Sequence, residues 1–355
     1  MNSTVIHERP GVYSSYDAST VISGGGAKKV VGVAAKAASG EKNKVVRVTG
    51  FEAGMAAFGK DTGKSTMAGI LKMLYLNGTA MVAAVAVPDT ATVEDYTKAF
   101  QLLQQEDVGV MLCDDETLAV QQALKKSVVE ASAARKERIA VVSLEDTAAA
   151  SLTTRAKELN SERVVLVGGC GMDEKGAAMK SVMSAAAVAG AIASNPDPAL
   201  PLNGAELHGM AGLTTLYQDE EIDLLVRGGV TPLESNAGVV SAVRGITTRT
   251  TTGNAPDTTW RELSTILIVD DVIPAIRNAL RRKFTRTKNT AQTRSAIRSQ
   301  VIVELEGKRS AEIIDSFSDV QVRASEAEPT VCEVEFSFAV AHGLNQIYLT
   351  AHITV

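Results

Sequence analysis

The sequence predicts an α/β protein, α+β overall, in which a parallel sheet is followed by a region of helices and strands. Three nearly continuous apolar segments, Val108–Leu112, Ile139–Leu144 and Val164–Val167, alternate with helical segments. This pattern is typical of parallel strands that are covered by helices on both faces. Near the C-terminus, Cys332–Phe338 and Ile347–Val355 alternate apolar with polar residues, which predicts half-buried strands. A chain of 355 residues that is 45% hydrophobic and 22% charged is long enough for two or three globular domains.

Composition argues against several functional classes. Aromatic residues make up only 4% of the chain and the net charge is −5, which disfavours a base-stacking or globally basic nucleic-acid binder. Cys113, Cys170 and Cys332 are too few and too widely spaced for a disulfide framework, which suits a reducing compartment. The first ten residues hold no apolar signal segment, and the longest apolar stretches fall short of the roughly 20 residues of a membrane span. We therefore expect a soluble cytosolic protein.

The N-terminal quarter is predicted to hold an arm and a small α/β region. Residues 1–22 contain a Pro10-Gly11 break followed by strand formers and hydroxyl residues, which predicts an extended arm. The run Gly24–Gly26 separates this arm from residues 23–90, a small α/β region. Its predicted strands are Val30–Ala34, Lys44–Val48 and Ala80–Val87, and its predicted helices are Glu52–Phe58 and Ser65–Leu76.

Residues 91–235 are predicted to form a separate α/β domain. It holds the three apolar strands described above and ends at a loop, Gly228–Pro232. Its predicted helices are Glu116–Ala134, Thr147–Leu159 and Met179–Ala193.

Residues 236–345 are predicted to form a third region, and residues 346–355 a terminal strand. Thr259–Glu262 has the pattern of a capping box that would begin a helix ending near Phe284. Pro274 should kink or split this helix near its middle. A second helix is predicted over Ala291–Glu306, stopped by Gly307.

One glycine-rich segment, Gly59–Thr66, ends like a nucleotide-binding loop. That loop needs G-x-x-x-x-G-K-[S/T], and here Phe58 stands at the place of the first glycine. The segment also follows a predicted helix, whereas a nucleotide-binding loop follows a strand. We therefore interpret it as an exposed turn whose Ser65 caps the next helix.

The carboxyl ends of the predicted parallel strands are the other place where chemistry could occur, because open α/β sheets bind ligands there. These ends carry Cys113–Asp115, Glu145–Asp146 and Gly168–Asp173. The acids could bind a metal ion and Cys170 could act as a nucleophile, but no histidine lies near them in the sequence. The favoured interpretation is that Asp115, Asp146 and Asp173 cap the following helices, while Cys113 and Cys170 pack as small hydrophobic residues.

Short fragments resemble those of a subtilisin-type protease, but the nucleophile is missing. They are Asp61–Gly63, His208-Gly209 and Gly78–Met81, and in the last of these Ala80 stands where a serine is required. The four histidines, moreover, lack metal-ligand spacing. We therefore predict no catalytic residue, no cofactor site and no metal site.

One segment, Arg277–Arg298, is strongly basic and contains no acidic residue. Its eight cations are Arg277, Arg281, Arg282, Lys283, Arg286, Lys288, Arg294 and Arg298. Such segregation of charge in an acidic chain favours a docking surface for an acidic partner, with a merely solvated basic helix as the alternative. DNA is possible as the partner, but no recognition-helix, zinc or aromatic signature accompanies the segment.

Taken in order along the chain, several motifs resemble those of contractile tail sheath proteins of bacteriophages and phage-tail-like bacteriocins. They are Glu8–Tyr13, Arg261–Leu263 with Asp270, the helix from Arg277 to Phe284, Lys288–Thr290 and the terminal Gln346–Thr350. The resemblance covers essentially the whole chain. Two departures are Thr287, where the family would place a glycine, and the absence of a proline and a Met-Glu-Lys run before Ile347.

The resemblance implies a structural subunit rather than an enzyme. Residues 91–235 would be an inserted, subtilisin-like outer domain, and residues 236–345 an inner domain that faces a tail tube. Subunits would stack as six-membered rings wound helically around the tube, attach to baseplate and tail terminator proteins, and contract to drive the tube through a target envelope. Such a subunit binds no nucleic acid, inserts into no membrane, and is made in the bacterial cytoplasm before it joins a phage or bacteriocin tail.

Particular residues acquire roles from this resemblance. Gly24–Gly26 and the segment near Gly253–Pro256 would be hinges for the terminal arms. The tube-facing basic helix would comprise Arg277, Arg281, Arg282, Lys283, Arg286 and Lys288. The strands exchanged between neighbouring subunits would comprise Val12, Tyr13, Ser14, Ser15, Ile347, Tyr348, Leu349 and Thr350. The alternatives are a hydrolase-like α/β enzyme that uses the sheet crevice and a protein that docks on DNA or another scaffold through Arg277–Arg298.

Overall fold

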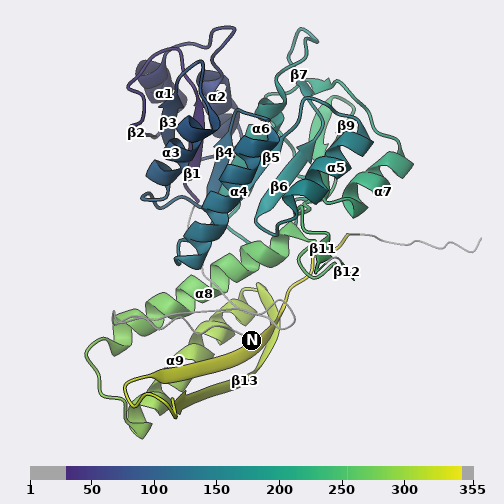
Figure 1. The fold of residues 1–355 in the computed structure, drawn as a ribbon. Coiled ribbons are helices and arrows are strands. Elements are labelled where there is room, and N and C mark those ends of the chain that lie inside the picture. Colours follow the sequence, from purple (N-terminus) through teal and green to yellow (C-terminus); the bar gives the residue numbers. More distant parts are fainter. Residues whose placement is uncertain (1–28, 254, 346–355) are drawn as a thin grey trace, which may run out of the picture. The chain divides into compact units, whose positions relative to one another are not determined.

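The computed structural model describes residues 29–253 and 255–345, which divide into two compact units (Figure 1). The sheet unit holds the described residues up to Ile266 together with residues 342–345. The hairpin unit holds Leu267–Ala341. The predicted arm residues Val12–Ser15 and Ile347–Thr350 lie outside the described residues.

The sheet unit is built on an eight-stranded sheet with the strand order β10-β9-β6-β5-β4-β1-β3-β2. The six strands from β9 to β3 in this order are parallel, whereas β2 and β10 pair antiparallel at the two edges. The strands are β1 (Val31–Lys36), β2 (Val45–Val48), β3 (Val82–Val87), β4 (Val110–Cys113), β5 (Ile139–Ser143), β6 (Val164–Gly168), β9 (Val230–Asn236) and β10 (Val239–Ala242). The predicted α/β fold with a parallel sheet is confirmed.

Helices cover both faces of this sheet, as expected for strands that are apolar throughout. They are α1 (Phe51–Phe58), α2 (Met67–Leu76), α3 (Val93–Leu103), α4 (Leu118–Ala133), α5 (Ala149–Leu159), α6 (Ser181–Ser194) and α7 (Asp219–Arg227). The helices α3, α4, α5 and α7 pack in sequence along one face, while α2 packs against α6 on the other (Figure 1). The small residues of α6 are almost all buried, which lets α2 and the strands approach this helix closely.

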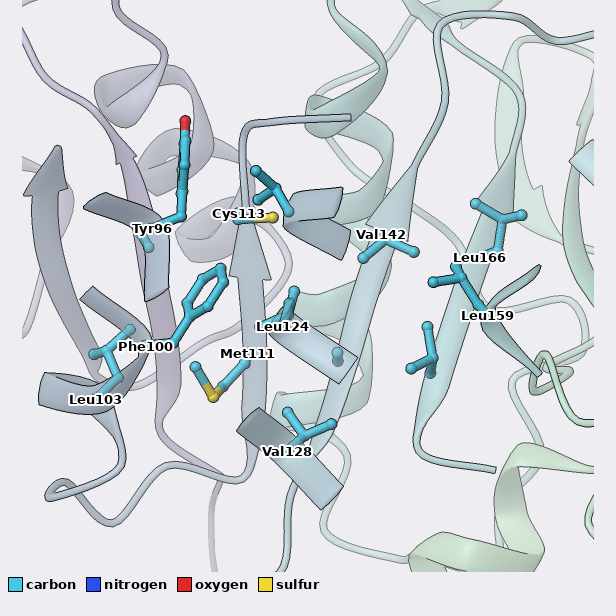
Figure 2. Close-up of a cluster of buried hydrophobic side chains, with 14 of the residues drawn as sticks. Tyr96, Phe100, Leu103, Met111, Cys113, Leu124, Val128, Val142, Leu159 and Leu166 are labelled. Atoms are coloured by element: carbon cyan, nitrogen blue, oxygen red, sulfur yellow. The ribbon is translucent and has the colours of Figure 1, made fainter. Parts of the chain in front are cut away.

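The core of the sheet unit lies between the parallel strands and the layer of α3, α4 and α5. Figure 2 shows the side chains of Tyr96 and Phe100 from α3 close to those of Met111 and Cys113 from β4. Tyr96 and Phe100 are at most 1% exposed, so the anchoring of α3 depends on apolar burial. The helix α3 was not among the predicted elements, although its Thr92 and Asp95 form a capping box.

The sheet continues across the position near residue 90 where the sequence analysis placed a domain boundary. The strands β3 and β4, from opposite sides of that position, both pair with β1. Pro88 ends β3, but α3 then packs back on the same sheet, so the chain does not leave the unit there. The segment Gly228–Pro232 is not the predicted closing loop, because its last three residues begin β9, and β10 then extends the sheet beyond residue 235.

Small two-stranded ladders complete the sheet unit. They pair β7 (Gly171–Met172) with β8 (Gly212–Leu213), and β11 (Thr251–Thr252) with β12 (Ala255–Pro256).

The hairpin unit contains most of α8 (Leu263–Phe284), which begins in the sheet unit, and all of α9 (Ala291–Ser310), β13 (Ile314–Ala324) and β14 (Cys332–Val340). The strands β13 and β14 pair antiparallel, and α9 packs against β13. The sequence pattern does not predict β13, whose register against β14 shifts at two positions. Gly307 does not stop α9, which continues to Ser310.

Pro274 lies inside α8, which is one uninterrupted helix, so the predicted split at this residue does not occur. The predicted capping box at Thr259–Glu262 does not begin the helix, which starts at Leu263. These residues are used in extended pairing instead: Thr247 Oγ1 donates to the Trp260 carbonyl at 2.6 Å, and Glu262 forms a bridge with Ile246.

Within the described residues, we find no helix with the length and apolar character needed to cross a membrane.

Candidate functional site

The basic segment occupies the end of α8, the following turn and the start of α9. Val272, Ile276 and Leu280 are buried at a spacing of four, so they form the buried face of α8. The last turn of α8 then carries Arg281, Arg282 and Lys283, whose positive charge is favourable beside the C-terminal end of the helix dipole.

Four of the eight cations are used inside the hairpin unit. Arg277 is only 9% exposed. Lys283 Nζ donates to Gln300 Oε1 at 2.7 Å, and Arg298 Nε donates to the Val320 carbonyl at 2.8 Å. Arg294 donates to Asn289 Oδ1 at 2.9 Å. The sequence alone could not separate Lys283 and Arg298 from the exposed cations, because their partners Gln300 and Val320 lie on α9 and β13.

The other four cations are exposed and available for a partner. Arg281 and Arg282 lie in the last turn of α8, and Arg286 and Lys288 lie in the turn before α9. Across residues 29–253 and 255–345, their side chains make no ion pair and no hydrogen bond that would neutralise them. We call these four residues the basic cluster; it retains four of the six residues predicted to face a tube.

The β13–β14 sheet has two strands, so within the described part of the chain each strand has an outer edge without a neighbour. The register of β13 shifts at two positions, and Asp319 has the left-handed φ of 54° that the first residue of a G1 bulge adopts. No residue of β14 has a left-handed φ angle, and along Cys332–Phe336 half-buried side chains such as Val334 alternate with exposed ones such as Glu335. The edge of β14 is therefore the more regular template for an added strand.

The carboxyl ends of β1 and β4 meet where the strand order reverses, which is the usual ligand position in an open α/β sheet. Here the acid that follows β4 is bound by protein groups. Asp114 accepts hydrogen bonds from the Lys36 backbone N–H at 3.1 Å, the Thr66 hydroxyl at 2.5 Å and the Tyr96 hydroxyl at 2.5 Å. With three donors already bound, Asp114 is a structural acceptor rather than a free general base.

The neighbouring acids also bind to protein groups. Glu116 accepts a hydrogen bond from the Ser181 hydroxyl at 2.6 Å and Glu145 accepts one from the Ser181 backbone N–H at 3.0 Å. Burial raises the pKa of Glu116. Both carboxylates therefore support the N-terminal end of α6.

Asp115 and Asp146 accept hydrogen bonds at 3.0 Å from the backbone N–H groups of Thr117 and Ala148, the residues that precede α4 and α5. They therefore stabilise the turns ahead of these helices and do not form the predicted caps. Asp173 likewise stabilises the turn at residues 173–177, because α6 begins only at Ser181.

The two cysteines near these acids are buried. Cys113 is 5% and Cys170 is 4% exposed. Burial raises the pKa of the Cys170 thiol to about 12 and also raises that of Cys113, so neither provides a thiolate at neutral pH. In the part of the chain that the structure describes, no group of three or more His, Cys, Asp or Glu side chains is arranged to hold a metal ion.

The glycine-rich segment Gly59–Thr66 is a helix-capping turn, but Ser65 is not the capping residue. Asp61 accepts hydrogen bonds from the backbone N–H groups of Ala68 and Gly69 at 2.9 and 2.6 Å, at the start of α2. Ser65 Oγ accepts from the Thr62 backbone N–H at 2.6 Å instead. The presence of Asp61 ahead of the helix could have suggested this cap, but the sequence does not show that the turn brings its carboxylate back to the start of α2.

Two sequence comparisons identify the family. The family model for the phage tail sheath protein central domain matches residues 89–248, and the model for the phage tail sheath C-terminal domain matches residues 255–354. Together these matches span more than two thirds of the chain. A search of the curated proteins gives no match.

Solved structures with the same fold are sheath proteins. A crystal structure of a sheath tail protein from Desulfitobacterium hafniense has a TM-score of 0.74 at 12% identity, covering 97% of this chain and 100% of that one. The helical sheath of the anti-feeding prophage in its contracted state has a TM-score of 0.74 at 13% identity, covering 98% and 99%. A sheath tail protein from Listeria innocua has a TM-score of 0.66 at 12% identity, covering 91% and 97%.

The fold and the two matching domain families agree with one another. The chain therefore belongs to the phage tail sheath protein family and is a structural tail sheath subunit.

Proposed function

We propose that this subunit polymerises as helically stacked hexameric rings around a tail tube and contracts to drive the tube through a target envelope. Two structures with the same fold are helical or multi-subunit sheaths in the contracted state, from the anti-feeding prophage and from an extracellular contractile injection system. A third belongs to a baseplate, which supports baseplate attachment as a further contact. A tail terminator protein would bind the other end, and synthesis would take place in the bacterial cytoplasm.

The observation that carries this proposal is the two-stranded β13–β14 sheet, in which each strand has an outer edge without a neighbour among the described residues. A strand from a neighbouring subunit can add to such an edge through main-chain hydrogen bonds. The proposed donors are Val12–Ser15 and Ile347–Thr350, whose residues favour extended structure. Because a mesh of exchanged strands can keep its hydrogen bonds while rigid units reorient, it suits a sheath that changes state without dissociating.

The basic cluster is proposed to contact the tail tube. Ion pairs at an accessible surface are individually weak and can be released together, whereas a dry apolar interface would resist sliding during contraction. Arg281, Arg282, Arg286 and Lys288 would make these contacts. Arg277 and Lys283, which the sequence analysis included, would instead support the hairpin unit from within.

We propose no catalytic role for the sheet crevice. Asp114 lies at the end of the sheet where an α/β enzyme would bind its ligand, and its carboxylate already accepts hydrogen bonds from three protein donors. Contraction would draw its energy from the difference between two packings of the same subunits, which requires no nucleotide site.

Negative-stain electron microscopy of the purified protein, over a series of protein and salt concentrations, tests polymerisation. Hollow tubes with a regular helical repeat are the expected result. If monomers persist, the same protein is mixed with assembled tail tubes. The proposal fails if the tubes stay bare under those conditions.

A further inference from the structure

The turn between α8 and α9 is fixed by its uncharged side chains. The Thr285 hydroxyl donates to the Arg281 carbonyl, and the Thr287 hydroxyl donates to the Phe284 carbonyl at 2.8 Å, so both close the C-terminal end of α8. Thr290 Oγ1 accepts a hydrogen bond from the Thr293 backbone N–H at 3.2 Å, which caps α9. Both helix ends are thus closed from within the turn.

Asn289 binds this turn to the loop that connects β13 with β14. Its Nδ2 donates to the carbonyls of Pro329 and Val331 at 2.9 and 3.1 Å. Its Oδ1 accepts a hydrogen bond from Arg294 at 2.9 Å. Both N–H groups and the oxygen of the Asn289 side-chain amide are therefore hydrogen-bonded.

Arg286 and Lys288 alternate with these bound residues and remain exposed. Arg286 has a left-handed φ of 63°, a conformation that favours glycine, yet the position carries a charged residue. A tightly ordered turn therefore presents two cations whose side chains make no internal bond across the described residues. Because the backbone that carries these cations is already ordered, less conformational entropy is lost when a partner docks.

The neighbouring loop indicates the chemistry of the partner. Glu326 and Glu328 are exposed in this loop, and Glu328 directly precedes Pro329, which binds Asn289. Cations and carboxylates thus flank the same hydrogen bonds. The phosphate backbone of a nucleic acid would be repelled by these carboxylates, and residues 285–290 contain no aromatic side chain for base stacking. A protein surface with acidic and basic groups side by side has no such conflict.

We infer that the turn at residues 285–290 and the loop at residues 325–331 form one preorganised, mixed-charge docking face for a protein surface that carries acidic and basic groups side by side. Asn289 is its positioning residue: it holds Arg286 and Lys288 in place without contacting the partner. This inference rests on the proposed contact between the hairpin unit and the tail tube, and it adds which residues prepare that contact.

The test measures binding of the full-length chain to immobilised tubes of the tail tube protein from the same particle. Asn289→Ala keeps the net charge, so the association rate should be unchanged while the dissociation rate rises roughly three- to tenfold. Lys288→Met should slow association and weaken its salt dependence. Asn278→Ala, at an exposed position on α8, is the matched control and should change neither rate.

A second measurement follows the turn without any partner. Trypsin cleavage after Arg286 and Lys288, followed by mass spectrometry, should become faster in Asn289→Ala at an unchanged thermal midpoint. Thr287→Val removes one of the hydrogen bonds in the turn with little change of shape and should have the same effect in smaller measure. It replaces Asn289→Ala if that variant does not fold.

The outcomes separate the inference from the proposed function. Faster cleavage with unaltered tube binding overturns the positioning role of Asn289 while leaving the basic contact intact. If neither Lys288→Met nor Asn289→Ala alters tube binding, the basic contact itself is wrong. Binding of duplex DNA at the same salt concentration, weakened by Asn289→Ala, would replace the protein partner with a nucleic acid.

Discussion

Asp114 illustrates how a single residue converts a common ligand position into a structural contact. Its carboxylate joins β1, α3 and the segment before α2 through the Lys36 N–H, the Tyr96 hydroxyl and the Thr66 hydroxyl. The sequence placed this aspartate at the end of a parallel strand, where binding and structural roles were both possible. The donors come from positions 18 to 78 residues away, so their convergence depends on the tertiary fold.

We predict that Asp114→Ala destabilises the sheet unit by about 2–3 kcal/mol, because it leaves buried donors without an acceptor. Urea unfolding of the full chain measures the change. Asp89→Ala, at an exposed position, is the control and should stay within about 0.5 kcal/mol of the unmodified protein. A loss for Asp114→Ala no larger than that of the control would contradict the structural role.

The raised pKa of Glu116 predicts that the free energy of unfolding depends on pH. Because burial raises its pKa in the folded state, the folded protein holds this proton more tightly than the unfolded chain does. Its contribution to stability is complete below the unfolded glutamate pKa of about 4.3 and is lost as the pH rises through the raised pKa. The free energy of unfolding of the unmodified protein should therefore fall relative to that of Glu116→Gln over this range. Parallel pH curves for the two proteins would exclude the effect.

At the scale of single elements, the β9–β10 hairpin turn contains a removable strain. Ala237 and Gly238 connect the paired residues Asn236 and Val239, and both have left-handed φ angles, 51° and 85°. A two-residue turn of this type favours Asn-Gly, whereas alanine is strained there.

Ala237→Asn should therefore raise the free energy of unfolding by about 0.5–1 kcal/mol. Chemical denaturation measures it, and Ala237→Gly provides the comparison. Glycine should gain less, because it also increases the entropy of the unfolded chain. A decrease for Ala237→Asn would show that the turn is set by another contact.

The end of α8 carries the element-scale prediction about docking. Replacing both Arg281 and Arg282 by glutamate should weaken binding to tail tubes at least about tenfold at low salt, because attraction becomes repulsion. Sheath–sheath assembly should be unchanged. Lys283, although adjacent, is a poorer choice because it is bonded to Gln300. Equal loss of assembly and tube binding would instead assign the cations to contacts between sheath subunits. The matched charge control is the double variant Lys72→Glu with Lys98→Glu, at two exposed positions of the sheet unit.

At the scale of the whole molecule, the chain combines two compact units with proposed terminal arms. If the arms exchange between subunits, deleting residues 1–20 should block polymerisation and leave a folded, soluble subunit. Electron microscopy of the truncated protein measures the first effect, and the cooperativity of thermal unfolding measures the second. Loss of cooperative unfolding would show that these residues belong to the fold of their own subunit.

Much of this molecule followed from local sequence pattern. Continuous apolar segments such as Val164–Val167 determine buried parallel strands, because only a sheet covered on both faces hides both sides of a strand. The cations of Arg277–Arg298 could also be recognised as a group. The pattern missed α3, α7, β9 and β13, which lacked uninterrupted periodicity or, like β9 with Pro232, contained a residue typical of loops. The excess acid in α7 and the bulges in β13 obscured their apolar positions.

The sequence by itself determined the α/β class, the parallel strands and the absence of a serine nucleophile at Ala80. Only the tertiary structure decided that one sheet crosses residue 90, that Asp61 rather than Ser65 caps α2, and that four of the eight cations are already bound. The reason is physical. Strand and helix formation depend on neighbours a few residues away, whereas the partner of a charged or polar side chain depends on which distant segments the fold brings within hydrogen-bond distance.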